Sequence, residues 1–313
     1  MTPLVSVVVP THNRASLLAR TVRSIARQNL FELEIIVVDD GSSDASAVTA
    51  CSVDARVRVI RHAHALGVSA ARNRGVAEAR GQWIAFCDDD DVWSPEKLEL
   101  QIAEAERTRA GWAYGGDVNV DAELRVLSGG PPPDPSAVVH YLPAWNPISS
   151  GGSNVIVRAD QLSAIGGFDV ALHRTEDWDL WIRLARSGPP AWVCAPLVAY
   201  RFHGGNAADD PGSMVTEAAA LASRHQIPVD MARMHRRAAW NALRAGRRLR
   251  ALRHYGDAIR CGDWRSLGRA AVALGHPAVG TDRLFDLLGR DEAWIARAQE
   301  WLEPLARLER NPA

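Results

Sequence analysis

The chain has 313 residues and a net charge of −1, and 47% of the residues are hydrophobic, as in an ordinary globular protein with a full core. No apolar run approaches the ~18 residues that a membrane span needs, and the N-terminus enters a strand pattern directly, unlike a signal peptide. The four cysteines are far apart and form no C-x-x-C pair, so we expect reduced core residues of a cytosolic protein, not disulfides or a zinc site.

Strand and helix patterns alternate over roughly the first two hundred residues. Short apolar or β-branched runs predict strands at 5–9, 34–38, 57–60, 83–87 and 154–158. Helical patterns follow at 18–25, 67–79, 95–107 and after Thr175. Alternation with strands that are apolar throughout predicts an α/β fold, a Rossmann-like and mostly parallel sheet with helices on both faces.

Polar residues follow three of these strands directly. Pro10-Thr11 ends the first strand, Asp39-Asp40 ends the second, and Asp88-Asp89-Asp90-Asp91 follows the run that ends at Cys87. Ligands bind beyond the carboxyl ends of the strands in such sheets. We therefore expect the three polar clusters to converge on one edge and to form the binding site.

The four consecutive aspartates are the most informative feature of the chain. Adjacent carboxylates repel one another and raise each other's pKa, so a fold keeps such a cluster when a cation fills it. Oxygen ligands of this kind suit Mg²⁺ or Mn²⁺. The alternative is an acidic, solvated loop that caps the next helix.

Residues 128–150 interrupt the alternation with a stretch rich in glycine and proline. A loop of this length in a compact domain is usually functional or disordered. We expect a lid or an acceptor-facing loop, and a flexible excursion is the alternative.

From residue 211 the patterns become helical, at 229–246, 248–261, 263–274 and 284–308. This predicts a division into a domain at 1–210 and an all-helical region at 211–313. Residues 231–270 contain eleven arginines and two aspartates, a local charge of +9. This basic stretch and the tryptophans Trp294 and Trp301 suggest contact with the acceptor, a second subunit or a membrane surface. A solvated arginine-rich face is the alternative, and no aromatic stacking motif supports nucleic-acid binding.

Five stretches occur in a fixed order along the chain. They are Val9-Pro10-Thr11-His12-Asn13-Arg14, Val37-Val38-Asp39-Asp40-Gly41-Ser42-Ser43-Asp44, Ala71-Arg72-Asn73-Arg74-Gly75, Asp88 to Asp91, and Thr175-Glu176-Asp177-Trp178. Together they resemble family 2 glycosyltransferases of the GT-A fold, over about the first 205 residues. The resemblance implies an inverting transfer from a nucleotide-diphosphate sugar, with Mg²⁺ or Mn²⁺ as cofactor.

The resemblance also implies roles for individual residues. Asp40 would accept the imide N–H of uracil or thymine, which favours a UDP-sugar and then a dTDP-sugar, and Arg72 would reach the diphosphate. An ordinary turn at Asp39-Asp40 and a surface arginine are the alternatives. The expected donor-binding residues are Pro10, Thr11, His12, Arg14, Asp39, Asp40, Arg72, Asp88 and Asp89.

Asp90 matches the metal ligand of the D-x-D motif, and His203 matches a histidine that faces the metal or diphosphate in relatives. Asp177 is the expected general base, although it stands in the first turn of a helix capped by Thr175. A helix N-terminus lowers a carboxyl pKa, whereas a useful base titrates nearer the working pH.

Two other functional classes stay open. A sugar nucleotidyltransferase would want a glycine-rich loop after the first strand, and residues 10–14 contain no glycine. A non-catalytic sugar-nucleotide-binding module would be expected to lose Asp90 or Asp177, and both are present. The acceptor is a glycan, a lipid-linked glycan or a small molecule, and we expect a cytoplasmic protein that works free or at the inner face of the membrane.

Overall fold

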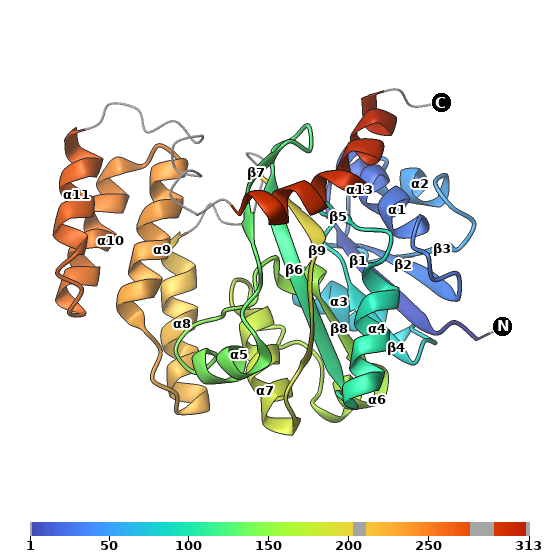
Figure 1. Cartoon of the computed structure of the whole chain (residues 1–313), viewed down its shortest axis with the longest axis horizontal. Coiled ribbons are helices and arrows are strands. Elements are labelled where there is room, and N and C mark those ends of the chain that lie inside the picture. The colour runs from blue at the N-terminus through green and yellow to red at the C-terminus, as the bar shows by residue number, and fades with distance from the viewer. Residues whose placement is uncertain (1, 203–210, 276–290, 311–313) are drawn as a thin grey trace.

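A single sheet forms the centre of the molecule, with helices on both of its faces (Figure 1). The structure is a computed structural model that describes residues 2–202, 211–275 and 291–310. In this part of the chain the strand order is β3-β2-β1-β4-β8-β6-β9-β5, and β7 pairs with β6. The strands are β1 Val5–Thr11, β2 Leu33–Asp39, β3 Val57–Arg61, β4 Trp83–Phe86, β5 Val92–Trp93, β6 Trp112–Val120, β7 Val126–Gly130, β8 Val155–Arg158 and β9 Ala191–Arg201.

The strands β3, β2, β1 and β4 pair in parallel, as the sequence predicts. All residues of β1, β2 and β4 are buried because helices cover both faces of this half of the sheet. Thr11 pairs with Asp39 at the carboxyl ends of β1 and β2, and the segment after β4 emerges at the same edge. This register gathers the three predicted polar clusters.

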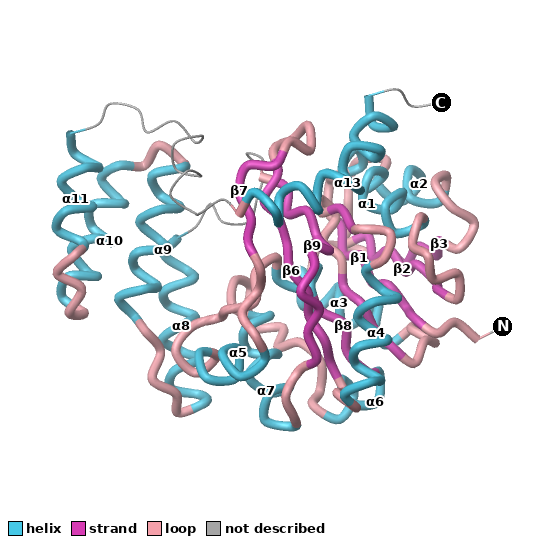
Figure 2. Tube along the Cα trace, in the orientation of Figure 1, coloured by secondary structure: helices cyan, strands magenta, loops and turns pink. Residues whose placement is uncertain are grey.

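The other half of the sheet is mixed, so the expectation of a mostly parallel sheet needs correction. The strand β8 runs antiparallel to β4 and to β6, and β5 runs antiparallel to β9. Figure 2 shows β8 near the long strands β6 and β9, with helices around the sheet. The long strands β6 and β9 are parallel to each other. The sheet with helices on both faces is otherwise the α/β architecture that the sequence predicts.

Two groups of helices cover the two faces of the sheet. One buried cluster joins Leu18 and Val22 of α1 and Leu98 of α4 to one face of the strands, and the other cluster joins α3 and α7 to the opposite face. The helices up to β9 are α1 Ala15–Ala26, α2 Ser46–Cys51, α3 Val68–Ala77, α4 Lys97–Thr108, α5 Pro135–Tyr141, α6 Ala159–Ala164 and α7 Glu176–Ser187, with a short 3₁₀ turn, η1, at Gly151–Asn154.

The segment at 128–150 is more ordered than the predicted loop. Its start completes β7, and α5 lies within it. Asp134 caps α5 by accepting a hydrogen bond from the Ala137 N–H, and Val138 packs in the main core. The sequence does not predict α5 because the many glycines and prolines of this segment are typical of a loop, although a proline also suits the first turn of a helix.

Five helices follow β9 in the described residues: α8 Pro211–His225, α9 Met231–Arg244, α10 Arg248–Arg260, α11 Ser266–Gly275 and α13 Glu292–Arg310. Ala218 and Leu221 of α8 belong to the same core as α7. Figure 1 shows α9, α10 and α11 beside the sheet, with α11 outermost. None of the helices that the structure describes is long and apolar enough to cross a membrane.

The helix α13 returns to the sheet. Trp294 is buried against β5, β6 and β9, and its indole N–H donates to the Asp117 carbonyl at 2.9 Å. Trp301 donates to the Pro196 carbonyl at 2.9 Å. The expectation of an external contact is therefore wrong for the buried Trp294, whereas for Trp301, which is only partly buried, it stays a prediction. The start of the predicted helix at 284–308 lies outside the described residues.

Candidate functional site

A hollow of about 320 Å³ lies at the carboxyl ends of the parallel strands. Most of the residues predicted for donor and metal binding line it. They are Pro10, Thr11, His12, Arg14, Asp40, Arg72, Asp88, Asp89 and Asp90, joined by Val68, Ala71, His173, Glu176 and Tyr200. The strand register therefore brings segments far apart in sequence into one site.

Asp89 and Asp90 share one cationic partner. Arg14 Nη1 lies 3.1 Å from Asp89 Oδ1 and 2.5 Å from Asp90 Oδ2, so a positive charge sits between the two carboxylates. Thr11 donates to the other oxygen of Asp89 at 2.7 Å. Burial and the neighbouring charge of Asp90 raise the pKa of Asp89 to about 7, although Arg14 opposes the rise.

This donor set fits a hard divalent cation. Mg²⁺ is typically held by one or two carboxylates together with substrate phosphates, and two carboxylates here already converge on one cation. Within the described residues, no three ligand atoms of the acidic run lie close enough to form a complete site by themselves. The remaining ligands would have to come from the donor diphosphate.

Asp91, the fourth aspartate, points away from the hollow. It is fully buried and accepts a hydrogen bond from the Arg201 N–H at 3.3 Å, while Arg201 Nε donates to the Asp90 carbonyl at 3.1 Å. Burial, with the charge of Asp90, holds the pKa of Asp91 well above its usual range. Asp91 therefore anchors the acidic loop to β9.

Arg72 connects the acidic run to α7. Its Nη2 donates to Asp88 at 2.7 Å, and its Nη1 contacts Glu176 at 3.2 Å and Asp177 at 3.1 Å. The guanidinium is 2% exposed and lies over the Phe168 ring, 5.0 Å from its centroid. The sequence predicts Arg72 as a diphosphate ligand, but it does not predict that three carboxylates bind it here.

Asp177 lies at the start of α7 beside the hollow. Burial raises its pKa to about 7, Arg72 opposes this rise, and the charges of Glu176 and Asp88 add to it. Its Oδ2 accepts from the Gly152 N–H at 3.0 Å. Burial is the largest cause of this shift, which runs opposite to the lowering expected from a helix N-terminus.

Two residues that the sequence interpretation missed support Asp177. Glu176 lines the hollow, and its signal was its place inside the Thr175-Glu176-Asp177 segment. Gly151 has a φ of +47°, and a Cβ atom at this position would collide with the Asp177 carboxylate. The paired glycines after Ser150 were the visible signal.

The Asp39-Asp40 turn orders the other end of the hollow. Asp39 is fully buried, and its Oδ1 accepts from the Ser42 N–H at 2.8 Å, so it supports the turn. The carboxylate of Asp40 accepts from the N–H groups of Leu66 and Gly67 and lies 2.7 Å from His62 Nδ1. Burial alone would raise the pKa of Asp40, but these hydrogen bonds outweigh it and lower the pKa.

Three contacts leave room on the Asp40 carboxylate, which offers about four acceptor positions. The imidazole of His12 lies against the same turn, with Nδ1 2.8 Å from the Asp40 carbonyl oxygen. His203, the second predicted metal ligand, lies outside the described residues.

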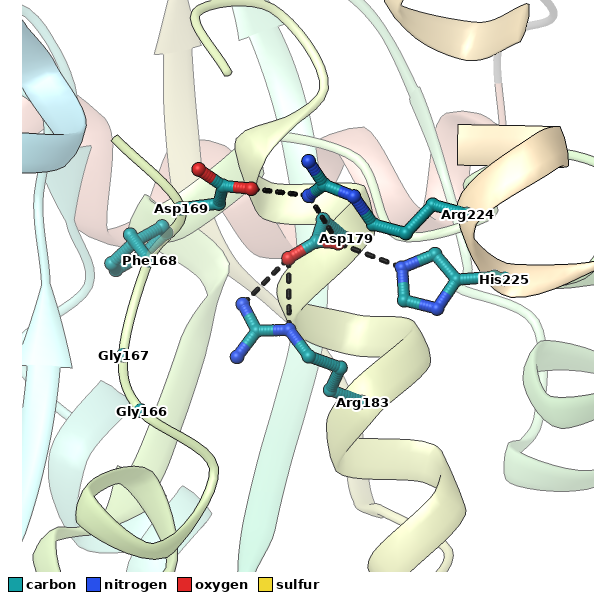
Figure 3. A pocket seen from close by; sticks show the side chains of 8 residues that line it. All are labelled: Gly166, Gly167, Phe168, Asp169, Asp179, Arg183, Arg224 and His225. Carbon is teal, nitrogen blue, oxygen red and sulfur yellow. Dashed lines mark hydrogen bonds and ion pairs between the residues drawn. The ribbon is translucent and has the colours of Figure 1, made fainter. Parts of the chain in front are cut away.

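A separate polar network holds α8 against α7 (Figure 3). Asp179, which is 1% exposed, accepts from Arg183 Nε at 2.8 Å, and its Oδ1 lies 2.7 Å from His225 Nε2. Arg224 pairs with Asp169 and lies 3.6 Å from Asp179. Figure 3 shows Arg224 and His225 reaching from α8 toward Asp179. The network fixes the helix that carries Asp177.

Residues 6–128 match the protein-family model described as "Glycosyl transferase family 2". The uncharacterized glycosyltransferase YwdF of Bacillus subtilis is 31% identical over 218 residues, which are 67% of this chain and 79% of that protein. The chain belongs to glycosyltransferase family 2.

Two other relatives of this family 2 glycosyltransferase are each matched over less than half of their own length. An uncharacterized glycosyltransferase of Rickettsia felis is 29% identical over 212 residues, 64% of this chain, and the match spans about a third (34%) of its length. The Escherichia coli protein named UDP-Glc:alpha-D-GlcNAc-diphosphoundecaprenol beta-1,3-glucosyltransferase WfgD is 33% identical over 113 residues, 36% of this chain and 45% of that protein.

Solved structures show that this family 2 glycosyltransferase has the GT-A fold that the sequence predicts. Residues 1–349 of Staphylococcus aureus TarS, in complex with UDP-GlcNAc, superpose with a TM-score of 0.56 at 18% identity, over 98% of this chain and 91% of that one. The mannosyltransferase PcManGT of Pyrobaculum calidifontis, with GDP-Man and Mn²⁺, gives 0.57 at 18% identity, over 99% and 88%.

Proposed function

We propose that the chain transfers a sugar, with inversion, from a nucleoside-diphosphate donor to an acceptor hydroxyl. One observation carries the proposal: Arg72, which lines the hollow, binds both Asp88 in the hollow and Asp177 beside it, so the acidic donor site and the candidate base are adjacent. In the transfer the acceptor oxygen bonds to the anomeric carbon, the bond from that carbon to the phosphate oxygen breaks, and the nucleoside diphosphate leaves with the electron pair.

Asp177 is the proposed base. As the acceptor oxygen attacks, its proton moves to the Asp177 carboxylate, whose pKa of about 7 suits a proton transfer near neutral pH. The Gly152 N–H and Arg72 orient the carboxylate before the acceptor arrives. Asp177 then leaves the reaction protonated and loses the proton to solvent.

Asp89 and Asp90 are the proposed ligands of Mg²⁺ or Mn²⁺, with Arg14 nearby. When bound, such an ion neutralises charge on the diphosphate as the sugar–phosphate bond breaks. The single nitrogen of Arg14 between the two carboxylates supports this position for a cation. Asp88 lines the hollow and its side chain is 31% exposed, which suits a contact with the donor.

Asp40 is the proposed recognition group for the base, and we propose a UDP-sugar first and a dTDP-sugar second. A carboxylate can accept the imide N–H of a pyrimidine, and backbone N–H groups hold Asp40 ionised at the far end of the hollow. Thr11 and His12 complete this end.

For the acceptor we propose a lipid-linked glycan. The printed name of WfgD places its acceptor on a diphosphoundecaprenol carrier. In this chain, Trp264 and Leu267 at α11 are 70% and 56% exposed within the basic stretch 231–270. An apolar and basic surface of this kind suits an anionic membrane surface.

A nucleotide-release assay tests the function. We expect slow release of the nucleoside diphosphate from UDP-sugars, less from dTDP-sugars and least from GDP-sugars, with Mn²⁺ or Mg²⁺ and not with excess chelator. Release of pyrophosphate from a sugar phosphate and a nucleoside triphosphate would indicate a nucleotidyltransferase instead. Tight donor binding without turnover, even with lipid-linked acceptors, would indicate a binding module.

A further inference from the structure

Two helices outside the donor site bring three metal-ligating side chains together. His235 lies on α9, and His254 and Asp257 lie three residues apart on α10. The Nδ1 atoms of the two histidines are 3.2 Å apart, and Asp257 Oδ2 lies 4.0 Å from His235 Nδ1. All three side chains are partly buried, and their ligand atoms lie within 4.8 Å of one another.

These distances match those of a tetrahedral site. Two nitrogen ligands at 2.0–2.1 Å from one tetrahedral Zn²⁺ are about 3.3 Å apart, close to the histidine separation observed here. Asp257 Oδ2 is farther away, at 4.0 Å from His235 Nδ1, so ion binding requires the 27% exposed Asp257 side chain to move toward the histidines.

We propose that His235, His254 and Asp257 bind a Zn²⁺ ion that joins α9 to α10, with water as the fourth ligand. The site is separate from the proposed donor site and has different chemistry. Imidazole nitrogens suit Zn²⁺, whereas the carboxylates of the acidic run suit Mg²⁺ or Mn²⁺.

Arginines stand near the cluster, and one of them binds Asp257. Arg250 and Arg253 oppose any cation near His254, and Arg260 binds Asp257 Oδ1 at 2.7 Å. The second oxygen, Oδ2, is the one that faces the histidines.

The packing of these helices gives the ion a role. Apart from Tyr255, the buried cluster between α9, α10 and α11 consists of alanines, which bury little apolar surface. An ion that binds only the folded pair stabilises it by mass action. A direct hydrogen bond between the two rings is the metal-free alternative for the same contact.

Metal titration of the full chain tests the proposal. After chelator treatment, the protein is titrated with Zn²⁺ by calorimetry and with Co²⁺, whose visible absorption reports four-coordinate geometry. We expect one ion per chain at this site and a melting temperature that rises with Zn²⁺. Loss of an outer-shell partner alone costs about 10- to 100-fold in affinity, so His254→Gln and His235→Gln should cost at least as much.

Two control variants test whether the Zn²⁺ binding and the Co²⁺ absorption come from this site. His140→Gln removes an exposed histidine on α5 and should leave Zn²⁺ binding unchanged. Asp90→Asn removes a ligand of the acidic run and should leave the Co²⁺ absorption unchanged. Circular dichroism confirms that each variant folds, and Asp257→Asn provides a milder ligand loss. Absence of the four-coordinate Co²⁺ spectrum in the parent, or its retention in folded His254→Gln, would overturn the proposal.

Discussion

At the scale of single residues, Asp177 depends on a balance of burial against charge. Burial and the carboxylates of Glu176 and Asp88 raise its pKa to about 7, and Arg72 limits the rise. Because a general base works only when ionised, kcat/KM should fall as the pH drops below about 7. An aspartate with the ordinary pKa near 4 would stay ionised as the pH falls from 7 toward 4, but it would be a weaker base.

Asp177→Asn keeps the side-chain shape and removes the proton acceptor. We expect turnover to fall by about 10²- to 10⁴-fold, the contribution typical of a general base. Donor affinity, measured by calorimetry, should barely change. Asp160→Asn, at an exposed aspartate paired with Arg158, is the matched control. A large loss of donor affinity with near-normal turnover would show that Asp177 is a binding residue.

Arg72→Gln should raise the pH at which activity is half-maximal. The guanidinium favours the ionised form of Asp177, and an opposite charge of this kind lowers a carboxyl pKa by about 1–3 units. The acidic limb of kcat/KM should therefore move upward toward alkaline pH. A variant that loses activity equally at every pH would show that Arg72 acts only on the fold or on the donor.

Asp90→Asn addresses the proposed metal position. We expect calorimetry to show that Mn²⁺ no longer strengthens UDP binding, because one of the two convergent carboxylates is lost. Binding of UDP without metal should change little, and the folded spectrum should be preserved. If turnover of the parent persists in excess chelator, no metal acts in the reaction and the proposed role of Asp90 is wrong.

At the scale of elements, the sequence predicts best where strands are buried on both faces. Continuous apolar runs identified β1, β2 and β4, and their polar ends located the hollow. The sequence does not predict which strands β7 and β8 pair with, or that the pairing is antiparallel, because strand neighbours are decided by tertiary packing. The Arg72 cluster was equally hidden, since residues 72, 88 and 177 meet only after folding.

The contact between α7 and α8 gives a stability prediction. Asp179 is 1% exposed and pairs with Arg183 through one oxygen and with His225 through the other. Asp179→Asn removes the negative charge and replaces one of these acceptor oxygens by an NH₂ donor. Breaking a buried pair in this way costs about 3–5 kcal/mol in the free energy of unfolding. Chemical denaturation measures the change, and Asp160→Asn should cost little. An equally small loss at Asp179 would mean that packing alone holds α8.

At the scale of the whole molecule, the proposed chemistry and the proposed membrane contact lie in different parts of the chain. The parallel strands and α7 hold the proposed chemistry, and α13 returns to the sheet with Trp294 buried and Trp301 partly buried. Exposed apolar residues lie instead in and just before α11: Leu267 and Val272 belong to the helix and Trp264 precedes it. Figure 1 shows α11 as the helix farthest from the sheet.

This surface predicts binding to anionic membranes. The full chain should sediment with phosphatidylglycerol vesicles but not with phosphatidylcholine vesicles, and added salt should weaken binding because exposed charges are screened. Trp264→Ser combined with Leu267→Ser should reduce sedimentation and transfer to a lipid-linked acceptor, while slow donor hydrolysis stays unchanged. Phe31→Ser, at a residue 81% exposed elsewhere in the chain, is the control. If the parent stays in the supernatant, or if both variants sediment equally with the parent, the surface does not bind membranes and the lipid-linked acceptor loses its structural support.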